Sequence, residues 1–262
     1  MAASGMAARA VLVTRPEGQA QALCNALRQR GLRVYHQPLI DLQGLPELAP
    51  AARQCVLDLD LYQHVIFISG NAVRFALPWL EDYWPQWPVG VNWYAVGAGT
   101  ARALAGFGIH AQLPGDEMNS EGLLRLAALR ELGGQRALIV KGEGGRELLR
   151  DELQRRGARV DQLACYRRLP ITLPAGAMAG RLAQWRPDVL LISSGEGLAN
   201  LLGLLSAEES AKLWQTTFIV PSQRVAQQAR AAGLEQVRVA ANASDPAMLE
   251  ALDVWRQETG EM

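Results

Sequence analysis

Short apolar runs alternate along this chain with stretches whose apolar residues recur at helical spacing. The runs VIFI (65–68), VLLI (189–192) and TFIV (217–220) are apolar almost throughout, which is typical of strands covered on both faces. Residues 17–30 have the helical pattern and are followed by Gly31, a common stop signal. Strands and helices in alternation predict an α/β fold built on parallel sheets.

The pattern also repeats itself. Residues 12–34 align with residues 138–160 without a gap at an offset of 126, and nine of the 23 positions are identical. Each copy has the pattern of a strand, a charged turn, a helix, a glycine and the start of a second strand. VIFIS (65–69) matches VLLIS (189–193) at an offset of 124, and residues 94–108 match residues 218–233 more loosely. Similar offsets in three places predict two related halves.

The repeat leaves the division into domains open. A cut near residue 136 would give two tandem units. In the alternative, the strands at 33–40 and 159–168, which each lead to a proline, cross between two globules, and the second globule is inserted in the first. Elsewhere the pattern predicts a helix over 120–130 and a break in regular structure over 43–50, which contains two prolines.

Four predicted strands end in small turns, most of them with hydroxyl side chains, that each open a helix. The turns are Ser69-Gly70-Asn71, Ala98-Gly99-Thr100, Ser193-Ser194-Gly195 and Ser222-Gln223. In parallel sheets such carboxyl-end loops lie together and form a ligand cleft, and helix N-termini favour anions. Arg15 and Lys141 follow equivalent strands of the repeat and add positive charge. The set predicts a seat for a polyanionic ligand; the alternative is that each turn only caps its helix.

The composition narrows the class of protein. The formal net charge of the 262 residues is zero, which argues against a broad electrostatic footprint for nucleic acid. Cys24, Cys55 and Cys165 are scattered and odd in number, as expected for reduced thiols of a cytoplasmic protein, and the three histidines are isolated, so we expect no metal. We recognise no signal peptide, and no apolar run approaches the roughly 20 residues that cross a bilayer, so we expect no membrane association.

Nucleotide-binding motifs fail on inspection. Residues 142–147 have Glu where the third glycine of GxGxxG belongs, and residues 97–102 have Arg there. The chain contains no GxxxxGK[ST], no GxSxG and no HExxH motif. The sequence therefore offers no conventional nucleophile, and we expect no cofactor.

Several segments together resemble the uroporphyrinogen-III synthase family of tetrapyrrole biosynthesis. They are VLVTRP at the N-terminus, FISGNAV (67–73), AVGAGTARAL (95–104), KGEGGRELL (141–149), CYRR (165–168), SSGEGL (193–198) and the turn-helix-Gly segment 219–233. Each motif is weak alone, but the series covers nearly the whole chain in the family's order.

The resemblance implies a fold and an activity. Members of the family have two similar flavodoxin-like α/β domains with parallel sheets and a two-stranded connection, the second domain being inserted in the first, and the active site lies in the cleft between them. For this chain it implies domain one at residues 1–37 and 169–262 and domain two at residues 38–168. It implies a cofactor-free lyase that closes hydroxymethylbilane, a linear tetrapyrrole with eight carboxylates, to uroporphyrinogen III with inversion of ring D and loss of water. A cytoplasmic monomer is expected, with transient contact to the enzyme that supplies its substrate as a further expectation.

The resemblance also bears on the site residues. It implies that Tyr166 is the catalytic proton donor, because the family has a tyrosine at this place; packing in the connection is its alternative role. The predicted substrate-binding residues are Arg15, Ser69, Gly70, Asn71, Gly99, Thr100, Lys141, Gly142, Gly144, Ser193, Ser194 and Ser222. This chain departs from the family at Ser222-Gln223, where Thr is common in relatives.

Two other classes of protein are the alternatives at this point. A two-lobed small-molecule binding protein without catalysis would also have lobes joined by crossover strands. A flavodoxin-like electron carrier would purify with yellow FMN bound.

Overall fold

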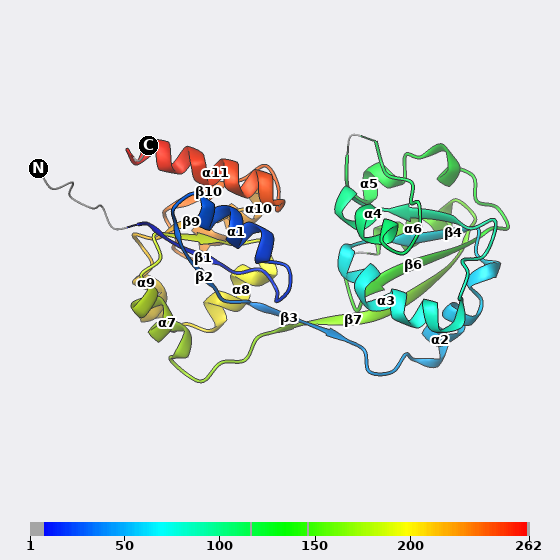
Figure 1. Cartoon of the computed structure of the whole chain (residues 1–262), viewed down its shortest axis with the longest axis horizontal. Helices are drawn as coiled ribbons and strands as arrows, with labels where there is room; N and C mark the ends of the chain where they lie inside the picture. Colours follow the sequence, from blue (N-terminus) through cyan, green and yellow to red (C-terminus); the bar gives the residue numbers. More distant parts are fainter. Residues whose placement is uncertain (1–7, 116, 146, 261–262) are drawn as a thin grey trace, which may run out of the picture. The chain divides into compact units, whose positions relative to one another are not determined.

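The computed structural model describes residues 8–115, 117–145 and 147–260, and in this part of the chain two five-stranded sheets are present. The strand order is β10-β9-β8-β1-β2 in one sheet and β3-β7-β6-β4-β5 in the other (Figure 1). The strands are β1 (Ala10–Val13), β2 (Arg33–His36), β3 (Ile40–Gly44), β4 (His64–Phe67), β5 (Asn92–Ala95), β6 (Arg136–Gly142), β7 (Arg159–Pro170), β8 (Val189–Leu191), β9 (Thr217–Val220) and β10 (Val237–Val239).

Helices connect these strands in the alternation that the sequence predicts. They are α1 (Gln21–Gln29), α2 (Pro50–Leu57), α3 (Gly70–Tyr83), α4 (Ala98–Ala105), α5 (Ser120–Leu123), α6 (Leu148–Arg155), α7 (Ala177–Trp185), α8 (Gly195–Gly203), α9 (Ala207–Ala211), α10 (Gln223–Ala231) and α11 (Asp245–Glu258), with the 3₁₀-helices η1 (Leu59–Leu61) and η2 (Ala127–Leu129). The strands of the first sheet pair in parallel throughout, in the 2-1-3-4-5 order typical of flavodoxin-like folds. The predicted fold class, α/β with parallel sheets, is confirmed.

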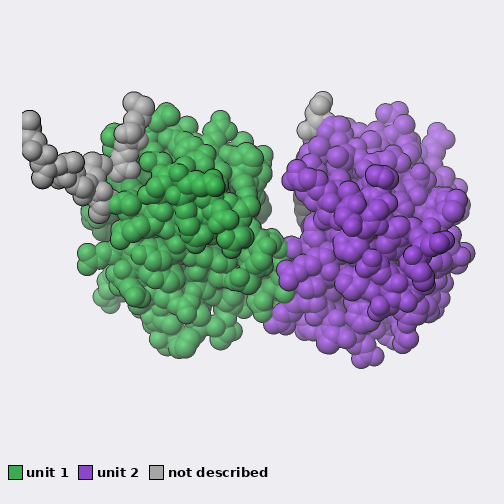
Figure 2. All heavy atoms as spheres, in the orientation of Figure 1, with its two compact units in different colours: residues 1–42, 169–262 green, residues 43–168 purple. Residues whose placement is uncertain are grey.

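The chain divides into two compact units (Figure 2). Unit 1 comprises Met1–Leu42 and Leu169–Met262, and unit 2 comprises Gln43–Arg168. The chain passes from unit 1 to unit 2 within β3 and returns within β7. The N–H of Leu45 donates to the carbonyl of Cys165 at 3.1 Å, and the N–H of Ile171 donates to that of Leu39 at 3.4 Å, so the two crossing strands are antiparallel.

The first crossing lies later in the chain than the predicted domain boundary between residues 37 and 38. Leu39 is fully buried and belongs to the core of unit 1, so the chain leaves this unit only after Leu42. The break in regular structure predicted over 43–50 also begins later than residue 43, because β3 continues to Gly44. The second predicted boundary, after Arg168, is also where the units divide.

The two halves of the sequence repeat are shared between the units. In the repeat, β1-α1-β2 corresponds to β6-α6-β7, and β4 corresponds to β8. Unit 1 joins β1 and β2 to β8, β9 and β10, whereas unit 2 joins β6 and β7 to β4 and β5. The orders β2-β1-β8-β9 and β7-β6-β4-β5 therefore match strand for strand. Each unit contains the first part of one copy and the second part of the other.

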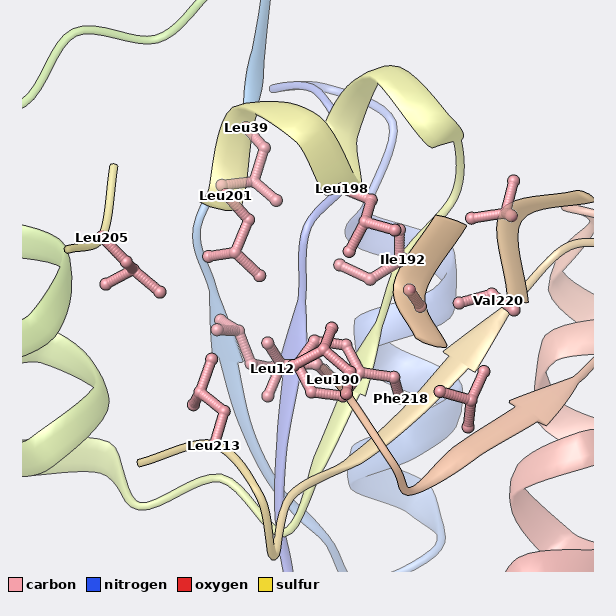
Figure 3. Close-up of a cluster of buried hydrophobic side chains, with 14 of the residues drawn as sticks. Leu12, Leu39, Leu190, Ile192, Leu198, Leu201, Leu205, Leu213, Phe218 and Val220 are labelled. Carbon is pink, nitrogen blue, oxygen red and sulfur yellow. The ribbon is translucent and has the colours of Figure 1, made fainter. Parts of the chain in front are cut away.

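The core of unit 1 lies on both faces of its sheet, because successive strand residues point to opposite sides. Leu12, Leu190 and Phe218 pack on one face with leucines of α8 and alanines of α10 (Figure 3). On the other face Val11, Val13 and neighbouring strand residues meet α1 and α11. A sheet covered on both faces explains the uninterrupted apolar runs in the sequence.

Two predicted helices differ from the observed ones. The helix expected over 17–30 begins at Gln21, because residues 17–20 form a turn in which the N–H of Gln19 donates to the carbonyl of Pro16. The helix expected over 120–130 stops at Leu123. Leu124 and Leu129 are buried in the same cluster, yet in one continuous helix they would point about 140° apart at roughly 100° per residue. The break after α5 lets both side chains reach the core.

Candidate functional site

In unit 2 the carboxyl ends of β4 and β6 lie at the same edge of the sheet, and β7 continues past them. Ser69 follows β4 and caps α3, where its Oγ accepts the N–H of Ala72 at 3.1 Å. Tyr166 lies on the long strand β7 and is only 3% exposed. Its hydroxyl lies 3.2 Å from Ser69 Oγ, so two residues predicted for the site are in direct contact.

Lys141 lies near the end of β6 and is 5% exposed. Its Nζ donates to Glu147 Oε1 at 2.9 Å. Gln162 donates to the other oxygen of Glu147 at 2.7 Å, and Arg150 lies 3.1 Å from it. These bonds, first that from Lys141 and then that from Gln162, hold the pKa of Glu147 below its usual range. Lys141 is thus an internal partner of the loop after β6, not the free cation that its position in the repeat suggests.

A cavity of about 430 Å³ opens beside these residues in unit 2. Predicted site residues that line it are Lys141, Gly142, Gly144 and Tyr166. Its other lining residues include Ile68 and Val96, which precede the turns at the ends of β4 and β5, and the cations Arg150 and Arg168. The cavity therefore combines loop backbone, a tyrosine side chain and arginine side chains, a mixture suited to carboxylates.

The remaining predicted residues of unit 2 lie at the starts of its helices. Gly70 is exposed and Asn71 half-buried in the first turn of α3. Gly99 is exposed in the first turn of α4, which lacks a side-chain cap, and Thr100 is 7% exposed with its N–H donating to the carbonyl of Gly97. Gly70 and Gly99 thus expose backbone at helix N-termini, whereas the Thr100 side chain is buried.

The predicted residues of unit 1 have local structural partners. Ser194 Oγ accepts the N–H of Gly197 and caps α8, and Ser222 Oγ caps α10 in the same way at Val225. Ser193 is half-buried beside its neighbour at the end of β8. Ser194 and Ser222 therefore act as helix caps, which is the alternative to a ligand-binding role for these turns.

Arg15 follows the end of β1, and its side chain binds the start of the last helix. Its guanidinium donates to the carboxylate of Asp245 and, at 2.7 Å, to the carbonyl of Ala243. Its side chain is 14% exposed. In the described structure Arg15 therefore fastens the start of α11 to the sheet.

A second cavity, of about 730 Å³, lies in unit 1 at the opposite end of the strands. Asp188 and Thr216, which directly precede β8 and β9, are among its lining residues. Ligands of open α/β sheets bind outside the carboxyl ends of the strands. We therefore place the candidate site at the smaller cavity of unit 2.

Sequence reasoning missed four residues around this cavity: Glu147, Arg150, Gln162 and Arg168. Glu147 lies inside the KGEGGRELL segment and Arg168 ends the CYRR segment, so both belong to motifs that carry the family resemblance. Gln162 alternates with Ala164 and Tyr166 along β7, and this period-2 pattern could have placed it on the same face.

Three further observations concern the described residues. No cluster of three or more His, Cys, Asp or Glu side chains that could hold a metal ion occurs among them. None of their helices is long and apolar enough to cross a membrane. Cys24, Cys55 and Cys165 are buried free thiols, and burial raises the pKa of Cys165 to about 12, so no activated thiolate is present at this site.

The fold and the site together define a two-unit α/β protein with parallel sheets and a polar, arginine-containing cavity at the carboxyl ends of the strands of unit 2. A family model described as "Uroporphyrinogen-III synthase HemD" matches residues 21–250. Uroporphyrinogen-III synthases of Salmonella typhimurium and Escherichia coli are each 36% identical to the chain over 247 residues, covering 92% of this chain and 99% of theirs. The chain belongs to the uroporphyrinogen-III synthase family.

Solved structures agree with the fold. A mutant uroporphyrinogen-III synthase from Thermus thermophilus matches with a TM-score of 0.60 at 20% identity, over 96% of this chain and 100% of that one. The Helicobacter pylori protein matches with a TM-score of 0.60 at 18% identity, over 95% of this chain and 100% of its own. The predicted family and the predicted enzyme class, a cyclising lyase of heme biosynthesis, are confirmed, and they replace the binding-protein and electron-carrier alternatives.

Proposed function

We propose that this protein closes hydroxymethylbilane to uroporphyrinogen III and that the cavity at the carboxyl ends of β4 and β6 holds part of the substrate during the reaction. The observation that carries the assignment of the site is the contact between the Tyr166 and Ser69 hydroxyls beside this cavity. Loop N–H groups and the cavity-lining side chain of Arg168 supply donors for the carboxylates of the substrate, whereas Arg150 is already bound to Glu147 and Asp151. The contribution of unit 1 to the site, and the cleft that the family resemblance implies, remain predictions.

Tyr166 gives its proton to the hydroxymethyl oxygen of the substrate. The carbon–oxygen bond then breaks, water leaves, and the lone pair of the pyrrole nitrogen forms an azafulvene cation. The far ring, ring D, bonds through the carbon that carries its methylene bridge to the methylene carbon of this cation, which gives a spiro intermediate. The bond between that ring carbon and the old bridge then breaks, and the released bridge carbon bonds to the unsubstituted carbon of ring D, so that the ring is inverted. The last pyrrole loses a proton when aromaticity returns, so the proton that Tyr166 gave is restored. Holding the chain in this folded arrangement is catalysis by positioning.

Ser69 assists this proton transfer. One lone pair of Ser69 Oγ accepts the N–H of Ala72, which leaves its own O–H available to donate to Tyr166 Oη. In that orientation the proton of Tyr166 is directed to the substrate, and the phenolate formed afterwards keeps one hydrogen bond. A hydrogen bond to the charged form favours that form.

The proposal is tested by incubating the purified protein with hydroxymethylbilane and separating the product isomers by chromatography. The wild-type protein is expected to give the type III isomer, whereas uncatalysed closure gives type I. Tyr166→Phe is expected to lower turnover about tenfold, at the low end of acid–base contributions. Tyr83→Phe, at an exposed tyrosine on α3, is the control and should keep full turnover.

The outcomes separate the activity from the role of the tyrosine. Only type I product from the wild-type protein would contradict the proposed activity. Type III product formed at an unchanged rate by Tyr166→Phe would remove Tyr166 from the mechanism and leave the activity standing.

A further inference from the structure

The ring of Tyr166 lies in a stack built from four elements of unit 2. Phe75 of α3 stacks on it, with ring centroids 5.3 Å apart and planes inclined by 23°. A Cβ on Gly142 of β6 would lie 2.7 Å from Tyr166 Cζ, so the tyrosine ring rests directly against this glycine. A Cβ on Gly44 of β3 would lie 3.0 Å from Phe75 Cδ1. We call Gly44, Phe75, Tyr166 and Gly142 the tyrosine stack.

The two glycines of the stack allow the aromatic rings to lie close to the backbone. The pairing of β6 with β7 shifts by one residue between Lys141 and Gly142, so that Gly142 lies opposite Tyr166 instead of Cys165. A shift of this kind re-aims a side chain, as β-bulges do next to active sites. Any side chain at Gly142 would displace the Tyr166 ring, since 2.7 Å is well inside the contact distance of two carbon atoms.

Phe75 holds the ring from a separate helix. It is half-buried, and the Arg74 guanidinium lies over its ring at 5.1 Å. The same helix is capped by Ser69, whose Oγ lies 3.2 Å from the Tyr166 hydroxyl. Helix α3 therefore contacts Tyr166 twice, at the hydroxyl through Ser69 and along the ring through Phe75. These contacts restrict tilting of the ring, and tilting is the motion that would carry the hydroxyl away from Ser69.

We propose that Phe75 is a positioning residue for the reaction, which holds the Tyr166 hydroxyl in place by stacking on its ring, and that Gly142 and Gly44 are glycines because the stack needs their backbones close. This inference rests on the proposed role of Tyr166 as proton donor. Misplacement of a reacting group by about 1 Å can cost about 100-fold in rate, so loss of a stacking partner is a sufficient cause for a large effect. Phe75 itself need not touch the substrate.

A double-mutant cycle tests whether Phe75 acts through Tyr166. Phe75→Leu is expected to lower kcat about tenfold while KM changes less than about twofold. In the Tyr166→Phe background the same substitution should change kcat by less than about twofold, because the hydroxyl that Phe75 positions is already absent. Phe75→Tyr keeps the ring and should restore most of the wild-type turnover.

A control separates positioning from general loosening of unit 2. Phe67→Leu removes another buried ring of this unit, which stacks on Trp93 and makes no ring contact with Tyr166. Its effect should multiply with that of Tyr166→Phe, and hydrogen exchange of β4 and β6 should report the stability of each variant.

Two results would overturn the inference. If Phe75→Leu lowers kcat by the same factor in both backgrounds, Phe75 does not act through Tyr166. If Tyr166→Phe alone leaves kcat unchanged, there is no hydroxyl to position, and the inference fails together with the role of Tyr166. Formation of the type III isomer by the wild-type protein tests the proposed activity separately in both cases.

Discussion

The ion pair between Lys141 and Glu147 allows a sharp test of what Lys141 does. Its position after a repeated strand suggests a substrate ligand, whereas the structure places its Nζ 2.9 Å from Glu147 Oε1. The two side chains are unequally exposed, at 6% for Lys141 and 33% for Glu147. We therefore expect Glu147→Gln to cost more stability than Lys141→Met, although both substitutions break the same pair.

The magnitudes follow from which partner is left behind. Removal of one member of a fully buried pair costs about 3–5 kcal/mol, because the other charge stays uncompensated. Glu147→Gln leaves the buried Lys141 ammonium without a counter-charge but keeps an acceptor oxygen in a partly exposed place, so we expect about 2 kcal/mol. Lys141→Met leaves Glu147 with Gln162, Arg150 and water, and it removes a buried charge, so we expect less than about 1 kcal/mol.

Hydrogen exchange of the β6 amides is the suitable assay, because a chain of two units need not unfold in one step. Glu147→Gln should lower protection roughly 30-fold, and the double variant should resemble Lys141→Met. The reasoning is refuted if Lys141→Met is the more damaging of the two. A tenfold rise in KM for Lys141→Met with unchanged protection would instead support the substrate-ligand interpretation.

The pH dependence of this pair has a definite sign. The pKa of Glu147 in the folded protein lies below its ordinary value of 4.5, chiefly because Lys141 donates to its carboxylate. The stabilisation is therefore complete above about pH 4.5 and is lost as the pH falls through the lowered pKa. The difference in protection between wild type and Glu147→Gln should be constant between about pH 5 and 7 and should shrink in more acidic solution.

Three further predictions concern other parts of the chain. Leu39→Ala should destabilise unit 1 by about 2–5 kcal/mol, because Leu39 is fully buried in its core, and hydrogen exchange should show lost protection in β1 and β8 but not in β4. Arg15→Met should change KM less than about threefold, because its guanidinium is already bound to Asp245, and steady-state kinetics should show this. Cys165, with its pKa raised to about 12 by burial, should resist iodoacetamide at pH 8, where only on the order of one thiol in 10⁴ is ionised, and mass spectrometry should find it alkylated only after unfolding.

Much of the fold could be predicted from the sequence, because it rests on burial that follows a regular period. The apolar runs became the buried strands β4, β8 and β9, and Ser69 and Ser194 became the caps of α3 and α8. The prediction of one helix over 120–130 was wrong, because here burial does not follow a regular period. The leucines of this segment fit a helical period, but they reach one cluster only after the chain breaks, which is a property of the packed unit.

The site was harder to predict, because the packed structure, and not a residue's place in the repeat, decides which partner each side chain meets. Arg15 and Lys141 have the same place in the repeat, yet one meets Asp245, 230 residues away, and the other meets Glu147, six residues away. Nothing in the local pattern around either cation predicts these bonds. Tyr166 was found through its motif alone, whereas its contacts with Phe75 and Ser69 depend on how α3 packs against β7.

The exchange of parts between the units explains why the repeat alone could not settle the domain boundaries. A tandem cut near residue 136 would leave β1 and β2 without β8, their neighbour in the sheet, and would leave β4 without β6. Each half would then contain two incomplete sheets with unpaired strand edges, an arrangement that proteins avoid. Residues 43–168, by contrast, contain β4, β5, β6 and most of β7, and all the side chains of the tyrosine stack. The compact unit that contains the candidate site therefore combines strands from both copies of the repeat. The sequence repeat, by contrast, runs from one half of the chain to the next.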